Sequence, residues 1–453
     1  MQKRISAFFM LTKEQMFGII IPKRGDIMDR TILHCDLNNF YASVECAKNP
    51  KLFGRPVAVC GNEDDRHGIV LAKSQPAKEC GIKTGDTVIE AKRKCKDVII
   101  VHPDFESYYN YSEQVKDIYK RYTDLIEPFG MDECWLDVSG SEMLFGNGEH
   151  IADELRKTVQ KETGLTISVG VSFNKVFAKL GSDMKKPDAT TVISRKDFKE
   201  KIWRLPADTL LFVGRKTFKT LQKYGVETIG DIANASPSFM RKILGKNGFD
   251  LWLYANGADT SPVSHMNIQP TLKSVSRGIT CVESLVSVAE AERVISELCV
   301  KVSKSLRQEH LLATGVQVAV KNESLTVQQY SSNLDFPTHN AKELFIEACC
   351  VLSKNHRWKN NVRSITVRAY NLISDTSFQQ LTVDYDIEEH DKIGAIDDTL
   401  TQIRNKYGND TVFCGCRLFG TKMPTGKSEH SSLPPASFYG NGNNPPRETV
   451  IRI

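Results

Sequence analysis

The chain has 453 residues, of which 60 are basic and 55 acidic, and its net charge of +5 is too small to indicate nucleic-acid binding by itself. Hydrophobic residues make up 40% of the chain, and its length favours about two to four domains. No stretch approaches the roughly 20 apolar residues of a membrane span, so we expect no membrane contact. The 12 cysteines include no Cys-x-x-Cys pair. This spacing argues against zinc or disulfides and favours reduced thiols in a cytoplasmic protein.

The two ends of the chain lack the patterns of folded segments. Residues 1–27 contain short apolar runs that Lys13 and Glu14 interrupt, without the long apolar core and small-residue cleavage site of a signal peptide. We expect a disordered extension there, or the product of an upstream start codon, with no targeting role. Residues 421–453 are rich in Gly, Ser, Asn and Pro and are predicted to be disordered.

The N-terminal half mixes strands and helices without a strict βαβ order, which favours an α+β fold. We expect strands at 31–36, 56–60, 68–72, 134–138 and 166–172. We expect helices at 39–47, 77–80, 88–94, 108–127, 151–163 and 174–184. Pro76 argues against a regular helix start before Ala77, and Pro128 sets the end of the long helix.

The pattern changes in the C-terminal half. Residues 202–257 read as short helices separated by glycines, and the polar segment 264–272 reads as a linker. A second α+β segment follows, with strands at 315–320, 325–330 and 364–369 and helices at 288–309, 341–355 and 391–407.

Three carboxylates stand where strands end or turn. Asp36 ends the first strand, and Asp132 and Glu133 precede the strand at 134–138. Hard oxygen donors of this kind suit Mg²⁺, and two such ions activate an attacking hydroxyl and neutralise a leaving pyrophosphate. Neighbours in an ideal strand point to opposite faces, so Asp132 and Glu133 share a site only if the turn bends the backbone. From spacing alone, acids that merely cap a hairpin turn remain an alternative.

Three longer blocks occur in order: HCDLNNFYASVE (34–45), GMDECWLDV (130–138) and SVGVSFNKVFAKLGSDMKKP (168–187). Together they resemble the Y-family of translesion DNA polymerases, and most closely its DinB or polymerase IV branch. The resemblance covers about residues 29–374. Three long blocks in the expected order are far more specific than any short motif.

The resemblance implies a right-hand polymerase of α+β class. It also implies a template-directed, low-fidelity DNA polymerase that carries out translesion synthesis in DNA repair, acting as a monomer on primed template DNA and deoxynucleoside triphosphates with two Mg²⁺ ions. The implied parts are a palm at 28–199 with inserted fingers at about 40–104, a helical thumb at 200–263, the linker 264–272, a little finger at 273–374, a tail at 375–420 and the disordered end 421–453.

The family's metal ligands and sugar selector fall on particular residues of this chain. The resemblance implies that Asp36, Asp132 and Glu133 are catalytic and hold both metal ions, together with the backbone carbonyl of Leu37. The family's steric gate against the 2′-hydroxyl falls on Tyr41, with Phe40 beside it. Without the resemblance, these two rings read as an aromatic pair in a core helix.

Contacts to the triphosphate are expected from two segments. The family's triphosphate lysine falls on Lys186. In the fingers, many family members carry Thr, Tyr and Arg where this chain has Ala72, Gln75 and Lys78. Lysine keeps the charge of arginine but loses its bidentate fork, and alanine makes no side-chain hydrogen bond, so nearby Lys73 or Ser74 is a candidate replacement.

Two regions are predicted to contact DNA. Residues 210–216 and 224–232 resemble a helix-hairpin-helix, which aims backbone N–H groups at a phosphate, although two helices packed through a glycine turn would look the same. The hairpin residues are Gly214, Arg215, Lys216 and Gly225. In the little finger, basic residues on predicted strands would contact phosphates or else protect strand edges: Lys273, Arg277, Lys321, Arg363 and Arg368.

Residues 379–385 (QQLTVDY) loosely resemble the peptide by which such polymerases dock on the sliding clamp. Gln380, Leu381 and Val383 would be its anchors, and the sequence leaves clamp binding open.

Three other functions are compatible with parts of the pattern. A metal-dependent phosphodiesterase would use the same carboxylates but would need no gate at Tyr41. A non-catalytic repair scaffold would bind DNA but would have no use for the three carboxylates. A bypass polymerase of the UmuC branch would need partner subunits.

Overall fold

The computed structural model describes residues 30–61, 68–268, 271–377 and 387–408, together with 411–413, 415, 418, 420, 422 and 423. The predicted extension at 1–27 and the predicted clamp peptide at 379–385 lie outside these residues, as does most of 421–453. None of the described helices is both long enough and apolar enough to cross a membrane. Packing divides the described residues into two compact units: the first comprises residues 30–35, 135–154 and 168–263, and the second comprises the other described residues.

A five-stranded sheet with the order β5-β6-β1-β7-β8 carries the first sequence block. Its strands are β1 (Ile32–Leu37), β5 (Ile126–Pro128), β6 (Glu133–Asp137), β7 (Ile167–Ser172) and β8 (Thr190–Ile193). Every residue of β1 and β7 is buried, as expected for central strands covered on both faces. The sequence predicted β1, β6 and β7. It missed β5 and β8, which are too short to give a periodic signal.

Helix α7 (Lys175–Met184) packs very closely on β7. Asn174 caps it, because its side-chain oxygen accepts a hydrogen bond from the backbone N–H of Phe177 at 2.8 Å. Gly170 permits the close approach, since a Cβ there would lie 1.9 Å from the carbonyl oxygen of Ala178.

The predicted run of short helices between 202 and 257 is confirmed. These helices share one apolar core that includes Leu210, Leu221 and Ile229. They are α8 (Phe198–Ile202), α9 (Arg215–Gln222), α10 (Ile229–Asn234), α11 (Pro237–Leu244) and α12 (Lys246–Ala255), with a 3-10 turn at Ala207–Thr209.

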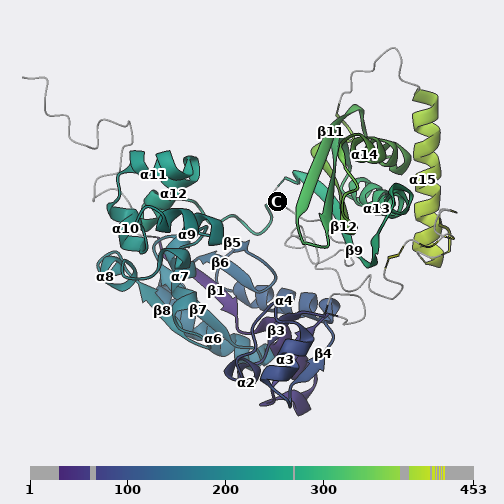
Figure 1. Cartoon of the computed structure of the whole chain (residues 1–453). Coiled ribbons are helices and arrows are strands. Elements are labelled where there is room, and N and C mark those ends of the chain that lie inside the picture. Colours follow the sequence, from purple (N-terminus) through teal and green to yellow (C-terminus); the bar gives the residue numbers. More distant parts are fainter. Residues whose placement is uncertain are drawn as a thin grey trace, which may run out of the picture. The chain divides into compact units, whose positions relative to one another are not determined.

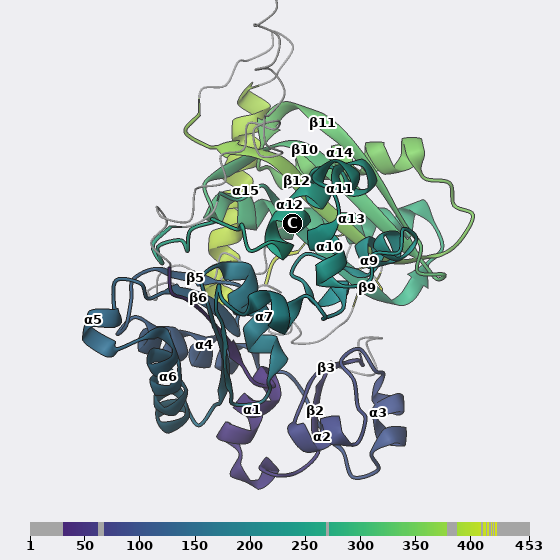
Figure 2. The same ribbon diagram turned by 90° about the vertical axis from the view of Figure 1, so that its left-hand side faces the viewer.

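In the second unit, a smaller sheet with the order β3-β2-β4 follows the first helix. Its elements are α1 (Phe40–Lys48), β2 (Val57–Cys60), β3 (Val70–Lys73), α2 (Gln75–Glu79), α3 (Val88–Lys94) and β4 (Ile99–Val101). Helices α2 and α3 lie beside this sheet (Figure 2).

Two helix boundaries predicted from proline are wrong. Helix α2 begins at Gln75, because Pro76 lies in the first turn, where no intrahelical N–H donor is needed. Helix α4 (Phe105–Tyr119) ends well before Pro128, and the expected helix over 108–127 is too long. Residues 126–128 form the edge strand β5 instead, and the backbone N–H of Phe129 closes its hairpin by donating to the carbonyl oxygen of Glu133 at 2.8 Å.

A four-stranded antiparallel sheet with the order β11-β10-β12-β9 forms the C-terminal part. Helices α13 (Val288–Gln308) and α14 (Ala341–Asn355) cover one of its faces (Figure 1). Its strands are β9 (Ser274–Leu285), β10 (Leu311–Asn322), β11 (Val327–Thr338) and β12 (Val362–Ser374). The sequence located parts of β10, β11 and β12 but did not identify β9.

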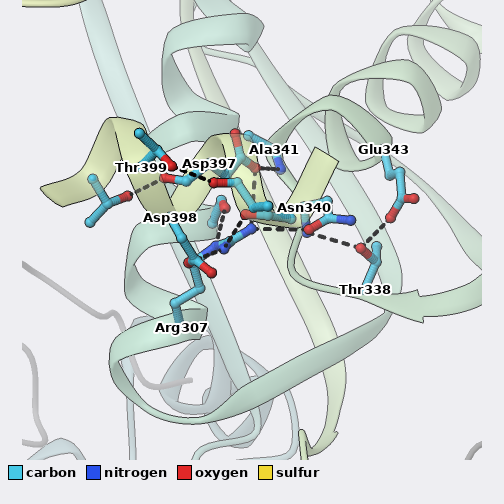
Figure 3. Close-up of polar contacts among 12 residues, drawn as sticks. Arg307, Thr338, Asn340, Ala341, Glu343, Asp397, Asp398 and Thr399 are labelled. Carbon is cyan, nitrogen blue, oxygen red and sulfur yellow. Dashed lines mark hydrogen bonds and ion pairs between the residues drawn. The ribbon is translucent and has the colours of Figure 1, made fainter. Parts of the chain in front are cut away.

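Helix α15 (Ile387–Tyr407) is attached to this part by polar contacts. Arg307 of α13 forms ion pairs with Asp397 and Asp398 of α15 (Figure 3). Asp397 also accepts a hydrogen bond from the backbone N–H of Ala341, the first residue of α14, at 2.8 Å. A carboxylate is favourable there because a helix N-terminus carries partial positive charge.

The two remaining helices, α5 (Glu142–Phe145) and α6 (Gly148–Thr163), follow β6, and α6 confirms the helix predicted near 151–163.

Candidate active site

The end of β1 and the turn before β6 are joined by a backbone hydrogen bond. The N–H of Leu37 donates to the carbonyl oxygen of Asp132 at 2.9 Å. Asp36, the residue before Leu37, is 6% exposed. Asp132 lies in a bend and Glu133 is the first residue of β6, so the bend that these neighbours need in order to share a site is present.

The donor set at this turn fits a hard divalent cation. Carboxylates of Asp36, Asp132 and Glu133 and the carbonyl oxygen of Leu37 are oxygen ligands of the kind that Mg²⁺ prefers. Across the described ranges, no three Asp, Glu, His or Cys side chains stand close enough to hold a metal ion as they are. The types of ligand therefore fit Mg²⁺, but the side chains as they stand in the described residues do not enclose an ion.

Helix α4 fixes the loop that carries Asp132. The hydroxyl of Ser112 donates to the carbonyl oxygen of Met131 at 2.5 Å, and Ser112 is buried. Burial raises the pKa of Cys134 to about 12, and Lys116 opposes that rise. The Cys134 thiol therefore stays protonated at neutral pH and is not a nucleophile.

Phe40 and Tyr41 occupy the first turn of α1, beside the same loop. Phe40 is buried and Tyr41 is half-buried. The Tyr41 hydroxyl donates to Sδ of Met131 at 3.8 Å. Burial raises the pKa of Tyr41 above its ordinary value, and the negative charge of Asp132 raises it further. Tyr41 thus lies close enough to the turn before β6 for its ionisation to depend on Asp132.

The fingers residues predicted to contact the triphosphate differ in burial and in their hydrogen-bond partners. Gln75 donates to Glu79 at 3.2 Å along α2. Burial, and then the positive charge of Lys78, lowers the pKa of Lys73, so these two lysines lie near each other. Ser74 is not a free replacement donor, because it is buried and its hydroxyl bonds to the backbone of Arg55 and Val57 at 2.9 Å. That part of the prediction is wrong.

In the other unit, Lys186 and Lys179 both face one carboxylate. Nζ of Lys186 lies 2.8 Å from one carboxylate oxygen of Asp183, and Nζ of Lys179 lies 3.6 Å from the other. Lys186, two residues after the end of α7, thus pairs with Asp183, and its contact with a triphosphate stays a prediction.

The thumb hairpin presents an open helix end. Gly214 is the residue before α9, and no side chain caps the first backbone N–H groups of that helix. Arg215 and Lys216 form its exposed first turn. Gly225 has φ of 72°, which the turn after α9 requires of it. These features are compatible with the predicted phosphate contact at Gly214 and assign Gly225 a turn role.

Arg277 does not lie on a DNA-accessible face, and its prediction as a DNA contact is wrong. It is opposite Val367 in the β9–β12 register, and Val367 belongs to the core under α13. Paired residues of antiparallel strands share a face, so Arg277 points toward the helices. It is 8% exposed and donates to the hydroxyl of Ser305 at 2.6 Å.

The opposite face of that sheet is open and polar. Arg368 pairs with Gln317 and Ser276, and Lys321 pairs with Ser364. The Nε atom of Arg368 is buried without a hydrogen-bond partner. Lys273 is exposed just before β9, and Arg363 is half-exposed at a bulge of β12.

Comparisons with family models and known proteins show which family this chain resembles. The impB/mucB/samB family matches residues 35–183, and the C-terminal domain of the same family matches residues 272–383. A DNA polymerase IV of Acetivibrio thermocellus is 45% identical over 86% of this chain and 98% of its own length. The chain belongs to the DNA polymerase IV family.

Further DNA polymerase IV relatives occur in Alkaliphilus oremlandii (34% identical, covering 85% of this chain and 98% of the relative) and in Bacillus subtilis (32%, covering 90% and 96%). A chimera of Y-family DNA polymerases has the same fold, with a TM-score of 0.67, 23% identity and coverage of 76% of this chain and 99% of the chimera. The predicted α+β polymerase fold is confirmed. DNA polymerase IV is a DNA-directed DNA polymerase of the Y-family translesion class, so the predicted enzyme class and function are confirmed as well.

Sequence reasoning missed the residues that support this site from α4. Tyr108 and Ser112 lie one turn apart on the buried face of a correctly predicted helix segment. Their spacing indicated burial. It gave no sign of which residues of α1 or of the loop they would contact.

Proposed function

We propose that this DNA polymerase IV homologue extends primed template DNA with low fidelity past damaged bases, and that its chemistry takes place at the β1 end and the turn before β6. The observation that carries the proposal is the backbone bond from Leu37 to Asp132, which puts the Asp36 and Asp132 segments side by side. The half-buried Tyr41 lies beside the same turn.

Asp36, Asp132, Glu133 and the carbonyl oxygen of Leu37 would hold two Mg²⁺ ions. When bound, the ions would activate the primer hydroxyl and neutralise the leaving pyrophosphate. The role of the protein is to fix the ligands: the β1–β6 pairing holds the backbone, and the Ser112 bond to Met131 holds the turn.

The remaining contacts are those that the resemblance to the family assigns to charged and bulky residues. The Tyr41 ring would occupy the space that a 2′-hydroxyl needs, with Phe40 beside it. Lys186 stabilises developing negative charge on the phosphates. Gln75 and Lys78 contact the triphosphate from the fingers, and the missing side-chain contact at Ala72 weakens that grip.

DNA is held mainly through its phosphates. The uncapped N–H groups after Gly214, with Arg215 and Lys216, bind one backbone segment. The candidates for phosphate contacts on or beside the C-terminal sheet are Lys273, Lys321, Arg363 and Arg368. Clamp binding through Gln380, Leu381 and Val383, a monomeric state and a cytoplasmic location stay predictions.

Primer extension by the intact protein and by an Asp132→Ala variant tests the proposal. With Mg²⁺ and all four deoxynucleotides, the intact protein should extend the primer as the template directs. Loss of one metal ligand should slow extension by about 1,000-fold, because metal ions supply several kcal/mol of transition-state stabilisation. Asp117→Ala, which removes an exposed carboxylate from α4, is the matched control and should keep full activity. Equal activity of the Asp132→Ala variant and the intact protein would reject the assigned site.

A further inference from the structure

The Tyr41 ring is backed by a ring from another helix. Tyr108 of α4 stacks on it, with centroids 4.4 Å apart and planes 15° from parallel. Phe105, one turn earlier on α4, meets both rings edge-on, with centroids 5.8 Å from Tyr41 and 5.7 Å from Tyr108. Tyr108 has no exposed surface at all. The side of Tyr41 that faces the protein is therefore filled by aromatic carbon.

The far end of Tyr108 is anchored as well. Its hydroxyl donates to Oε1 of Glu45 at 2.7 Å, and Glu45 is itself buried, one turn after Tyr41 on α1. Burial raises the pKa of Tyr108, and the hydrogen bond to Glu45 raises it further, so Tyr108 remains a neutral donor.

The anchor continues to the start of α4. Lys48 lies 3.7 Å from Oε2 of Glu45 and forms an ion pair with Asp104. Asp104 caps α4 by accepting from the backbone N–H of Ser107 at 3.2 Å. Helices α1 and α4 are thereby tied together next to the Tyr41–Tyr108 stack.

We propose that Tyr108, held by Glu45, is a positioning residue for sugar selection: it prevents the Tyr41 ring from retreating when a ribonucleotide enters. The inference rests on the proposed gate role of Tyr41. A ring excludes a hydroxyl group by steric conflict only if the ring cannot move away at small cost. Tyr41 is in the first turn of its helix and half-exposed, so its ring is not enclosed on every side by the protein. The stacked ring 4.4 Å behind it removes the space into which it would move.

The test measures kcat/KM for insertion of a deoxynucleotide and of the matching ribonucleotide by the full-length protein. Tyr41→Ala is the reference variant and should lose most of the discrimination. Tyr108→Leu leaves space behind Tyr41 and should raise the relative efficiency of ribonucleotide insertion by about tenfold, the scale of a lost aromatic pair. Tyr108→Phe keeps the stacked ring and should retain most of the discrimination.

A matched control distinguishes an effect on the position of Tyr41 from a general loss of protein stability. Tyr119 is also buried on α4, about 16 Å further along the helix axis. Tyr119→Leu should lower stability as Tyr108→Leu does, yet leave the ratio of the two insertion efficiencies unchanged. If Tyr108→Leu does not fold, Phe105→Leu, at the first turn of α4, should relax discrimination in the same direction by a smaller factor.

The outcomes are distinguishable. Relaxed selection in both Tyr41→Ala and Tyr108→Leu supports the inference. If Tyr41→Ala relaxes selection but Tyr108→Leu leaves the ratio of the two insertion efficiencies unchanged, the positioning role is overturned and the gate role stands. If Tyr108→Leu does not fold, an unchanged ratio in Phe105→Leu has the same meaning. Unchanged selection in Tyr41→Ala rejects the gate, and the positioning role with it.

Discussion

At the scale of single residues, His339 has an environment that disfavours its charged form. Burial, with the positive charge of Arg307, lowers the pKa of His339 to about 4, and its Nδ1 atom is buried without a hydrogen-bond partner. The carboxylates of Asp398 and Asp375 oppose this lowering, and His390 adds to it. His339 is therefore held neutral in the folded protein.

We therefore predict that His339 makes the folded protein less stable as the pH falls. The folded pKa is lower than the ordinary 6.5, so the contribution of His339 to stability is present above pH 6.5 and is lost as the pH falls toward 4. Urea unfolding followed between pH 7 and pH 4 should show a shallower loss of stability in His339→Gln than in the intact protein. Equal pH profiles for the two proteins would contradict the prediction.

Some residues of the site could be predicted from the sequence, and others could not. Asp36 and Asp132 stand in blocks whose local pattern already marked a strand end and a turn. The sequence offered Ser74 as a replacement donor because it lies close to Ala72. Only the folded structure shows that the Ser74 hydroxyl is hydrogen-bonded to the backbone of Arg55 and Val57.

At the scale of elements, α15 is held mainly by charge. Arg307 has a side chain that is 10% exposed, and it donates to the carbonyl oxygen of Gly394 at 3.2 Å in addition to its two ion pairs. Removing one partner of a nearly buried ion pair leaves uncompensated charge, which is strongly destabilising.

We therefore predict that Arg307→Met loosens α15 selectively. Backbone amides of α15 should exchange with deuterium at least about tenfold faster than in the intact protein, because local opening becomes easier. Amides in the helices between 202 and 257 should be unaffected. Arg293→Met, on the exposed side of the same helix α13, is the matched control. Unchanged protection of α15 would show that other contacts hold it.

Helix and strand boundaries were harder to predict than the elements themselves. Helix α14 was predicted at its observed bounds, because its apolar positions repeat with helical spacing. The C-terminal end of α4 was misplaced, since the pairing of β5 in the sheet overrides the local helical pattern of residues 120–127.

At the scale of the whole molecule, the small net charge makes the placement of basic residues decisive. A protein that neutralises DNA phosphates releases counterions, so its affinity falls with salt in proportion to the number of contacts. Arg368 and Arg277 lie on opposite faces of one sheet and so provide a matched pair.

Binding of primed DNA should distinguish these two arginines. Arg368→Ala should weaken binding to all sequences and reduce the slope of log affinity against log salt by about 1. Arg277→Met should lower stability by disturbing the contact with Ser305 while leaving the salt slope unchanged. Fluorescence anisotropy over a salt series measures both. An unchanged slope in Arg368→Ala would remove this residue from the proposed DNA interface.

The sequence by itself determined the polymerase family, the α+β class and the candidate metal ligands, because these depend on long blocks of residues that are contiguous in the chain. Tertiary structure alone decided which face of the sheet carries Arg277 and which ring stands behind Tyr41. Both facts depend on the register and packing of segments that are far apart in the sequence. The pattern within each segment indicates burial, but it does not specify the contacting partner.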